Sequence, residues 1–352
     1  MSHSPSAPLR AAAVVCGLAA LLCPGQAGAY CRAVTASPPA GYNPATQGCF
    51  DGEPDGGPVF TLFWRNQCTS YSLQNPATKQ IPQSDVSRIA AQAFASWSSA
   101  SCPGGMPSIS AIAYPTVECS QVPSQEHNNV IIFRDDVWPY DDSANAIGFT
   151  TLTVDLTDGE IVGADIEINS ANYQIVADGP AINGAYDLGS ILTHEAGHFL
   201  GLAHSADKSA VMYAFYQPGS TTLADDDISG ICSTYTPDGS RNTSTGAVAQ
   251  ETCNAAPLLG FLSECGSLDS GIGGSFATAV GSGAGVDGVG GTDPPAPCSA
   301  TTCATSRTLG SRTSGREGAA SGFATCALVA FGALGRRRKR GRRAPTASPP
   351  PA

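Results

Sequence analysis

Basic side chains are scarce in the central part of this 352-residue chain. Residues 30–237 contain 22 Asp and Glu but only six Lys and Arg. Recognition of a nucleic acid requires a basic face, and so few cations over this length do not make one. The sequence therefore excludes nucleic acid as a partner, and most of the acidic residues are typical of a soluble protein surface.

Histidine is rare as well, and closely spaced cysteine pairs are missing. The chain has five His and 13 Cys, and no two Cys stand in a C-x-x-C arrangement. A cysteine-based zinc site is therefore not expected. Three Cys lie in the terminal segments, and the remaining ten are an even number suited to disulfide bonds in an oxidising compartment.

The N-terminal end lacks an apolar run long enough to span a membrane. Residues 11–22 are apolar, follow Arg10 and precede the small-residue site Ala27-Gly28-Ala29. A membrane-spanning helix needs roughly 20 apolar residues. The pattern is that of a secretory signal peptide over residues 1–29, so we expect an exported protein whose mature form starts near Tyr30.

The C-terminal end has the opposite arrangement, in which an apolar segment is followed by basic residues. Residues 321–335 are apolar, and residues 336–343 contain seven Lys and Arg. A basic block stops transfer across a membrane, whereas a GPI signal ends in hydrophobic residues. We expect residues 321–352 to be an anchor or sorting tail, and membrane or cell-surface contact only through it. The tail resembles the C-terminal sorting signals of myxobacterial surface proteins, although Cys326 lies inside the apolar segment and not just before it.

Composition divides the remaining chain into three parts. Residues 30–57 form an N-terminal segment in which Cys31 and Cys49 are expected to pair. Residues 58–237 have the length of one domain. Residues 238–320 are dominated by Gly, Ser, Thr, Ala and Pro, which predicts a linker, stapled locally by its own cysteines. These are Cys253, Cys265, Cys298 and Cys303.

The central domain has the pattern of a mixed α+β fold. Apolar or Thr-rich runs predict strands, and Asp158-Gly159 predicts a turn between two of them. A helix capped by Ser84 is expected to bury Val86, Ile89, Ala93, Phe94 and Trp97 on one face, and Asp187 is expected to start a second helix. The predicted strands are residues 59–64, 130–133, 147–154 and 161–168.

The second helix carries a metal-binding pattern. His194 and His198 are four residues apart, so their imidazoles lie on one helix face with Glu195 beside them. Gly201 is the expected end of the helix, where a left-handed residue turns the chain so that His204 supplies a third ligand. Three protein ligands with one open position are the arrangement of catalytic zinc, and Glu195 is the expected general base. Two other interpretations are a structural zinc domain and a surface-binding module. A structural zinc site would need a fourth protein ligand, and the motif offers none. A binding module could lose the general base, whereas this chain keeps Glu195 and all three His.

This pattern, H-E-x-x-H-x-x-G-x-x-H, resembles the metzincin zinc peptidases. Ser205 after the third His and the segment 209–213 around Met212 are similar to the matrixin branch, and so are residues 223–231. Residues 157–169 and 186–188 resemble secreted bacterial matrixin-like proteases. The resemblance implies a metzincin fold with a twisted, mostly parallel sheet, an active-site helix, a Met-turn and a C-terminal helix. It implies a zinc endopeptidase (EC 3.4.24 class) that acts on proteins or peptides, and we expect a monomer.

The resemblance also implies where substrate binds. Tyr216 is expected to line the specificity pocket, and an extended substrate is expected along an edge strand. The residues of that strand are Gly148, Phe149, Thr150, Thr151 and Leu152. Separately, carboxylates at Asp158, Glu160 and Asp165 are candidates for Ca²⁺, which takes clustered oxygen ligands.

The chain departs from typical matrixins at three points. His127 is the one histidine left over, so the second, structural zinc site of matrixins is not expected. No P-R-C-G-x-P-D segment precedes the domain, so the usual cysteine latency device is missing from residues 30–58. Ala214 stands where matrixins have Pro after the Met-turn and where other metzincins have a Tyr ligand, so no such ligand is expected.

Overall fold

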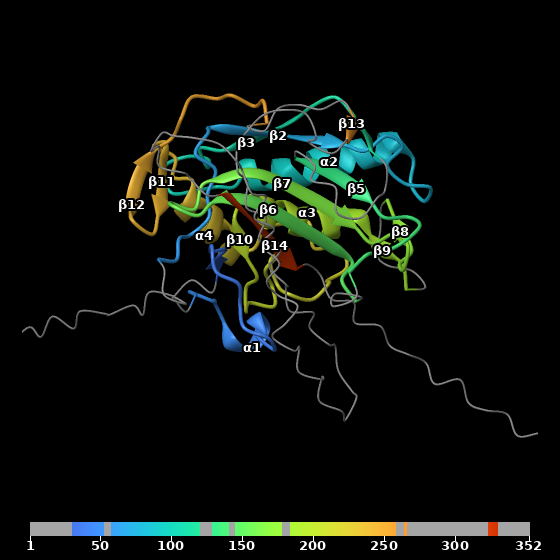
Figure 1. Cartoon of the computed structure of the whole chain (residues 1–352), viewed down its shortest axis with the longest axis horizontal. Helices are drawn as coiled ribbons and strands as arrows, with labels where there is room; N and C mark the ends of the chain where they lie inside the picture. The colour runs from blue at the N-terminus through green and yellow to red at the C-terminus, as the bar shows by residue number, and fades with distance from the viewer. Residues whose placement is uncertain are drawn as a thin grey trace, which may run out of the picture.

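The computed structural model describes residues 30–52, 58–119, 129–140, 145–177, 184–257, 264–265 and 323–329. The predicted signal peptide, His127, the Arg-rich block and most of the predicted linker lie outside the described residues. Figure 1 shows one twisted sheet with two long helices packed on it. The expected mixed α+β fold with a mostly parallel sheet is confirmed.

The main sheet has the strand order β14-β6-β7-β5-β2-β3. The central pairs β7 with β5, β5 with β2 and β2 with β3 are parallel, whereas β6 runs antiparallel to β7 and to β14. The predicted strands over 130–133, 147–154 and 161–168 are confirmed within one residue. The bounds are β2 Cys68–Leu73, β3 Ser110–Ala113, β5 Val130–Phe133, β6 Gly148–Asp155, β7 Ile161–Ile168 and β14 Phe323–Val329.

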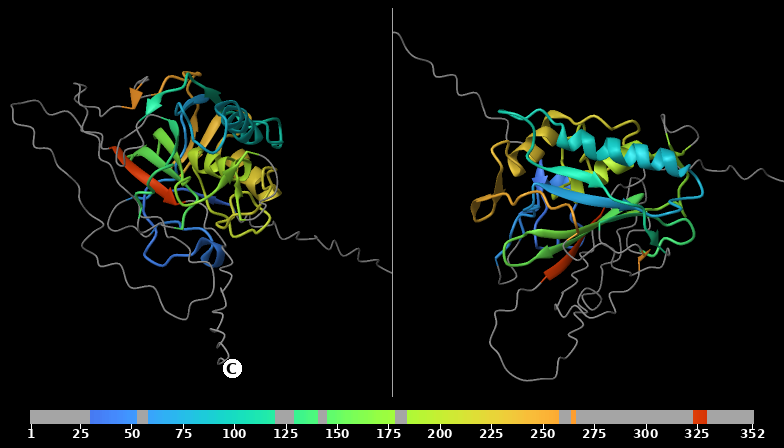
Figure 2. Two further views of the ribbon diagram at one scale, coloured as in Figure 1. Left: turned by 90° about the vertical axis from the view of Figure 1, so that its right-hand side faces the viewer. Right: turned by 90° about the horizontal axis from the view of Figure 1, so that it is seen from above.

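Helices α2 (Gln83–Ser98) and α3 (Leu188–Phe199) pack against each other on the sheet (Figures 1 and 2). The face of α2 predicted from the sequence is buried, and Phe94 on it stacks on Tyr71 of β2 with ring centroids 4.4 Å apart. α4 (Asp225–Thr234) is the expected C-terminal helix, and α1 (Pro44–Gln47) is a single turn. The hydrophobic core therefore lies between the sheet and these helices.

Four pairs of short strands surround this core. β1 (Cys31–Arg32) pairs with β10 (Leu202–Ala203), and β11 (Ser240–Thr243) forms a hairpin with β12 (Gly246–Ala249). The other two pairs are β8 (Ile175–Val176) with β9 (Tyr186–Asp187) and β4 (Glu118–Cys119) with β13 (Glu264–Cys265). Among the described residues, no helix has the length and apolarity needed to cross a membrane.

Two local predictions are wrong. Residues 59–64 form no strand; they make only isolated bridges through Thr61 and Phe63, because the segment crosses the core with Leu62 and Phe63 both buried. The first long helix begins at Gln83 after Pro82, without a side-chain cap, so Ser84 is inside the helix and does not cap it. Proline is favoured at helix starts, where a missing N–H is not needed.

Three disulfides join distant segments within the part of the chain that the structure describes. Cys31–Cys49 is the predicted pair and is confirmed. Cys102–Cys232 and Cys68–Cys253 join residues 130 and 185 positions apart. The expectation that Cys253 pairs locally within the linker is therefore wrong, because its partner is in β2.

The chain remains packed beyond residue 237, inside the range predicted as linker. Arg241 of β11 is fully buried, and its guanidinium donates to the carbonyl oxygens of Trp64 and Asn66, both at 2.9 Å. The same side chain donates to the Ser108 hydroxyl at 2.6 Å. The buried guanidinium of Arg241 thus holds the β11–β12 hairpin against the rest of the domain. The low apolar content of residues 238–320, on which the linker prediction rested, gives no sign of this contact.

Candidate active site

The active-site helix brings the three predicted metal ligands together. Asp187 caps α3 by accepting the N–H of Ser190 at 2.7 Å, and His194 and His198 follow on one face of the helix. Gly201 then has φ +87°, where a Cβ would lie 2.9 Å from the carbonyl oxygen of Leu62. The reversed chain returns His204, and the ligand atoms of the three histidines all lie within 4.8 Å of one another.

The surroundings of the histidines fit a bound zinc ion. Nδ1 of His194 lies 2.7 Å from the carbonyl oxygen of Val211, and Nδ1 of His198 lies 2.8 Å from that of Leu202. A ring N–H donated to a carbonyl in this way leaves Nε2 with its lone pair for a metal. Burial lowers the pKa of all three imidazoles, that of His198 to about 4, so they are neutral near pH 7. Neutral imidazole is the form that binds zinc.

A turn beneath the histidines carries Met212, as the matrixin resemblance implies. The carboxylate of Asp227 accepts the N–H groups of Val211 at 2.8 Å and Met212 at 3.0 Å, and so holds the turn to α4. Asp226 accepts the hydroxyl of Ser205 at 2.6 Å. The sequence predicted the helix but not these hydrogen bonds to Asp226 and Asp227. The run of three Asp at the start of α4 was the sequence feature that could have indicated them.

Glu195 is fully buried on α3, next to the first histidine. Burial raises the pKa of Glu195 to about 8, and a hydrogen bond from the Thr150 hydroxyl to its Oε2 at 2.6 Å opposes this rise. A carboxyl whose pKa is close to the working pH can both take and return a proton. A buried carboxyl with a raised pKa therefore directly follows the first of the three histidines on α3.

The five residues predicted to bind substrate all lie on β6, but they do not face the same way. Gly148 and Thr150 face α3, where both approach the carboxyl of Glu195. Phe149 packs against Tyr140 with ring centroids 4.7 Å apart, in a separate apolar cluster with Trp138. The side chain of Leu152 is buried in the main core, and that of Thr151 is partly exposed.

Tyr216 lies where the Met-turn leads toward the start of α3. Its hydroxyl donates to the Asp187 carboxylate at 2.5 Å and accepts the Asp187 N–H at 3.0 Å. Burial, together with this carboxylate, raises the pKa of Tyr216, so the phenol remains protonated. The loop predicted to shape the specificity pocket is thus fastened to the cap of the active-site helix.

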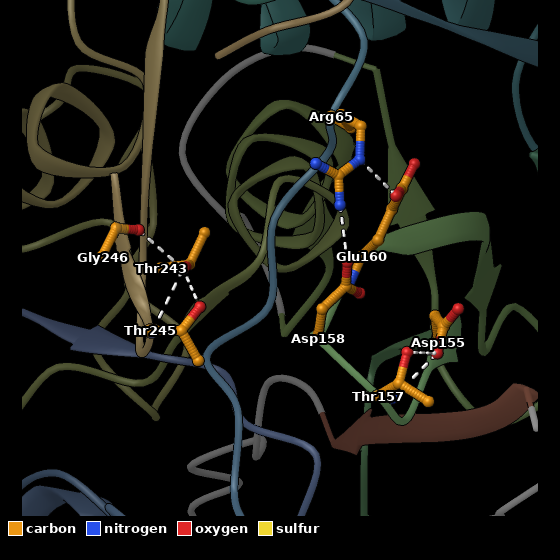
Figure 3. Close-up of polar contacts among 8 residues, drawn as sticks. All are labelled: Arg65, Asp155, Thr157, Asp158, Glu160, Thr243, Thr245 and Gly246. Carbon is orange, nitrogen blue, oxygen red and sulfur yellow. Dashed lines mark hydrogen bonds and ion pairs between the residues drawn. The ribbon is translucent and has the colours of Figure 1, made fainter. Parts of the chain in front are cut away.

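The three calcium candidates do not form one ligand set. Arg65 binds Asp158 at 2.5 Å and Glu160 at 2.6 Å, as Figure 3 shows, whereas Asp165 accepts the N–H of Val130 at 2.9 Å. Calcium at Asp158 and Glu160 would compete with the guanidinium of Arg65. Within the described ranges, the histidine triad is the one group of three or more His, Cys, Asp or Glu with metal-binding spacing.

The triad, the adjacent carboxyl and the Met-turn define a zinc metallopeptidase domain of the metzincin class. Within that class, the sequence model of the matrixin family matches residues 63–236, and this part of the chain is a matrixin domain.

Similar proteins support this assignment over the domain alone. The chain is 27% identical to neutrophil collagenase of Homo sapiens over 204 residues, 56% of this chain and 38% of that protein. It is 29% identical to matrix metalloproteinase-20 of Homo sapiens over 191 residues, 53% of this chain and 34% of that protein. A match to metalloendoproteinase 1 of Glycine max is 46% identical over 56 residues, 15% of this chain and 18% of that protein. The chain thus spans less than two-fifths of the length of each of these relatives.

Proposed function

We propose that the chain is a secreted or surface-anchored endopeptidase that hydrolyses peptide bonds in proteins with the help of one zinc ion. The observation that carries this proposal is the histidine triad, with ligand atoms within 4.8 Å of one another, beside the buried carboxyl of Glu195. A structural zinc site would have a fourth protein ligand. No fourth His, Cys, Asp or Glu joins the triad among the described residues.

His194, His198 and His204 would hold the ion, and Glu195 would move the proton. Bound zinc acidifies water and polarises a carbonyl group, which prepares both partners for hydrolysis. Glu195 takes the proton of the attacking water and later gives it to the departing amine. No side chain attacks the substrate in this scheme, so no covalent acyl-enzyme forms.

The substrate would be an extended peptide segment that pairs with β6. A strand at the edge of a sheet offers unpaired N–H and C=O groups, so main-chain hydrogen bonds provide affinity and side-chain pockets provide specificity. Gly148 and Thr150 bring β6 against Glu195, so a peptide that took the place of β14 along β6 would lie next to the base. Tyr216, held by Asp187, would form part of the pocket beside the cleaved bond.

The proposal that the enzyme is exported rests on the two ends of the sequence and on the disulfides. The signal-like segment 1–29 and three disulfides in the domain support export to an oxidising compartment. We propose a bacterial, monomeric enzyme whose residues 321–352 attach it to the cell surface or direct its sorting. Deletion of those residues should then release active enzyme into the medium, and loss of activity in a correctly folded truncated protein would contradict this modular arrangement.

A peptide-library cleavage profile tests the activity most broadly. Purified protein loaded with one zinc per chain should cleave a subset of extended peptides, lose that cleavage with a chelator, and regain it when zinc is restored. Zinc-loaded protein that cleaves no peptide in the library would rule out the proposed function.

A further inference from the structure

The two carboxyl oxygens of Glu195 have different surroundings. Oε2 accepts the hydroxyl of Thr150 at 2.6 Å. Oε1 is buried too, but no hydrogen-bond partner for it is found among the described residues. One oxygen is therefore held and the other is free to receive a proton.

Strand β6 creates this difference because alternate residues of a strand face the same side. Thr150 and Gly148 both face α3, so one strand supplies a hydroxyl at Oε2 and a residue without a side chain at Oε1. A Cβ at position 148 would lie 2.8 Å from Oε1 and 3.1 Å from Ile191. A side chain at position 148 would therefore push the carboxyl of Glu195 out of its present position.

We propose that Thr150 is a positioning residue that holds Oε2 of Glu195 so that Oε1 is the oxygen that takes the proton. This inference rests on the proposed function, in which Glu195 is the general base. The terminal torsion of a glutamate is broad and nearly two-fold, so packing alone fixes its orientation poorly. A hydrogen bond to one oxygen removes this freedom, and well-aligned groups transfer protons faster than loosely held ones.

The test uses Thr150→Val, which removes the hydroxyl and keeps the shape, and Thr150→Ser, which restores a hydroxyl. Thr150→Val should lower kcat roughly tenfold with KM unchanged, and Thr150→Ser should recover most of the loss. Both variants should still bind one zinc per chain and unfold at the wild-type temperature. Thr69→Val is the matched control, because Thr69 is a buried strand threonine in β2 whose hydroxyl has no partner among the described residues.

The outcomes separate the inference from the proposed function. An unchanged kcat in Thr150→Val, or a Thr150→Ser variant as slow as Thr150→Val, would overturn the positioning role while the wild type remains an active peptidase. In a Glu195→Ala background, Thr150→Val should cause no further loss, because the group that it positions is gone. A wild type without any peptidase activity would instead refute the proposed function itself.

A second inference comes from an independent observation, the pairing of β6 with β14 on the side away from β7. β14 pairs antiparallel with β6 from Phe323 opposite Asp155 to Val329 opposite Phe149. Figures 1 and 2 show this red strand at the edge of the sheet. It occupies the edge to which we assign the substrate.

We infer that the C-terminal segment Phe323–Val329 restrains the enzyme by competing with substrate for β6. One edge accepts one strand, so the segment and an extended substrate exclude each other. A tethered segment acts at an effective concentration that reaches the mM range, well above that of most free substrates. Insertion of the tail into a membrane, or its removal, would free the edge. This inference depends on the proposed substrate position.

Ala327→Pro in the full chain tests the competition, because proline fixes φ near about −65°, far from the roughly −140° of an antiparallel strand, and so disfavours pairing of β14 with β6. The variant should show a KM at least threefold lower than wild type at equal kcat, whereas Ala319→Pro, outside β14, should not. A synthetic peptide of residues 321–331 should raise the KM of the Ala327→Pro variant. Equal KM values for wild type and Ala327→Pro would overturn the inference, and inactivity of both would refute the proposed function.

Discussion

Gly197 of α3 lies at the point where the Met-turn and α2 meet the metal-binding helix. A Cβ at this position would lie 2.2 Å from Sδ of Met212 and 2.7 Å from Cζ2 of Trp97. Ordinary contacts between such atoms are about 3.5–4.0 Å, so Gly197→Ala forces one of these side chains to move by more than about 1 Å. Trp97 also donates its indole N–H to the carbonyl oxygen of Thr193 at 2.7 Å, which resists that movement.

The expected cost follows from two opposing effects. Alanine is favoured over glycine inside a helix by about 1 kcal/mol, while overpacking a well-filled core costs about 1–3 kcal/mol. Met212 and Trp97 are 2% and 0% exposed, so neither has room to relax and the cost should be near the upper value. We expect Gly197→Ala to lower the free energy of unfolding by about 2 kcal/mol. The displaced Met212 should also weaken zinc binding at the neighbouring His198.

The assay compares urea unfolding of the metal-free protein and zinc affinity for wild type, Gly197→Ala and Gly189→Ala. Gly189 is in the same helix, but a Cβ there would have its nearest neighbour, Cγ2 of Thr221, at 3.2 Å. That control should keep wild-type zinc affinity and lose little or no stability. A Gly197→Ala protein as stable as wild type, with unchanged zinc affinity, would refute the packing argument.

Three further predictions concern the stability of the folded protein and its dependence on pH. Replacing both Cys102 and Cys232 by serine should lower the free energy of unfolding by about 2–5 kcal/mol in urea denaturation, and an unchanged midpoint would contradict a structural role for this disulfide. Arg134→Met should cost about 3–5 kcal/mol, because it leaves the buried carboxylate of Glu167 without the guanidinium 2.5 Å away; a loss below 1 kcal/mol would contradict this. The pKa of His198 is about 4 in the fold against 6.5 in the unfolded chain, so the unfolded chain binds more protons between these values. Stability of the metal-free protein should therefore fall by on the order of 3 kcal/mol as pH drops from 6.5 to 4, and a stability that stays constant over this window would be contrary evidence.

The metal site could be predicted because its geometry is local. His194 and His198 are one helical turn apart, and Gly201 marks the reversal that returns His204, so sequence spacing alone brings the ligands together. Strand β5 could be predicted equally well because it is a continuous apolar run, and β7 because its residues alternate after the turn signal Asp158-Gly159.

Features that depend on distant contacts could not be predicted. β2 has the sequence CTSYSL, and all six residues are buried although four of them carry hydroxyl groups and the strand shows no apolar alternation. The contact of Thr150 with Glu195 joins residues 45 positions apart, and Cys68–Cys253 joins residues 185 positions apart. No local pattern encodes such pairs, since they arise only when the sheet and helices have packed.

The central claim is that His194, His198 and His204 bind the zinc ion and that Glu195 is the base without being a ligand. Zinc content and casein cleavage should be measured together for wild type, Glu195→Ala and His198→Ala. Glu195→Ala should keep one zinc per chain and lose at least 10²–10⁴-fold in rate, the range typical for loss of a general base, whereas His198→Ala should lose both metal and activity. A Glu195→Ala protein that cleaves casein as fast as wild type would contradict the mechanism.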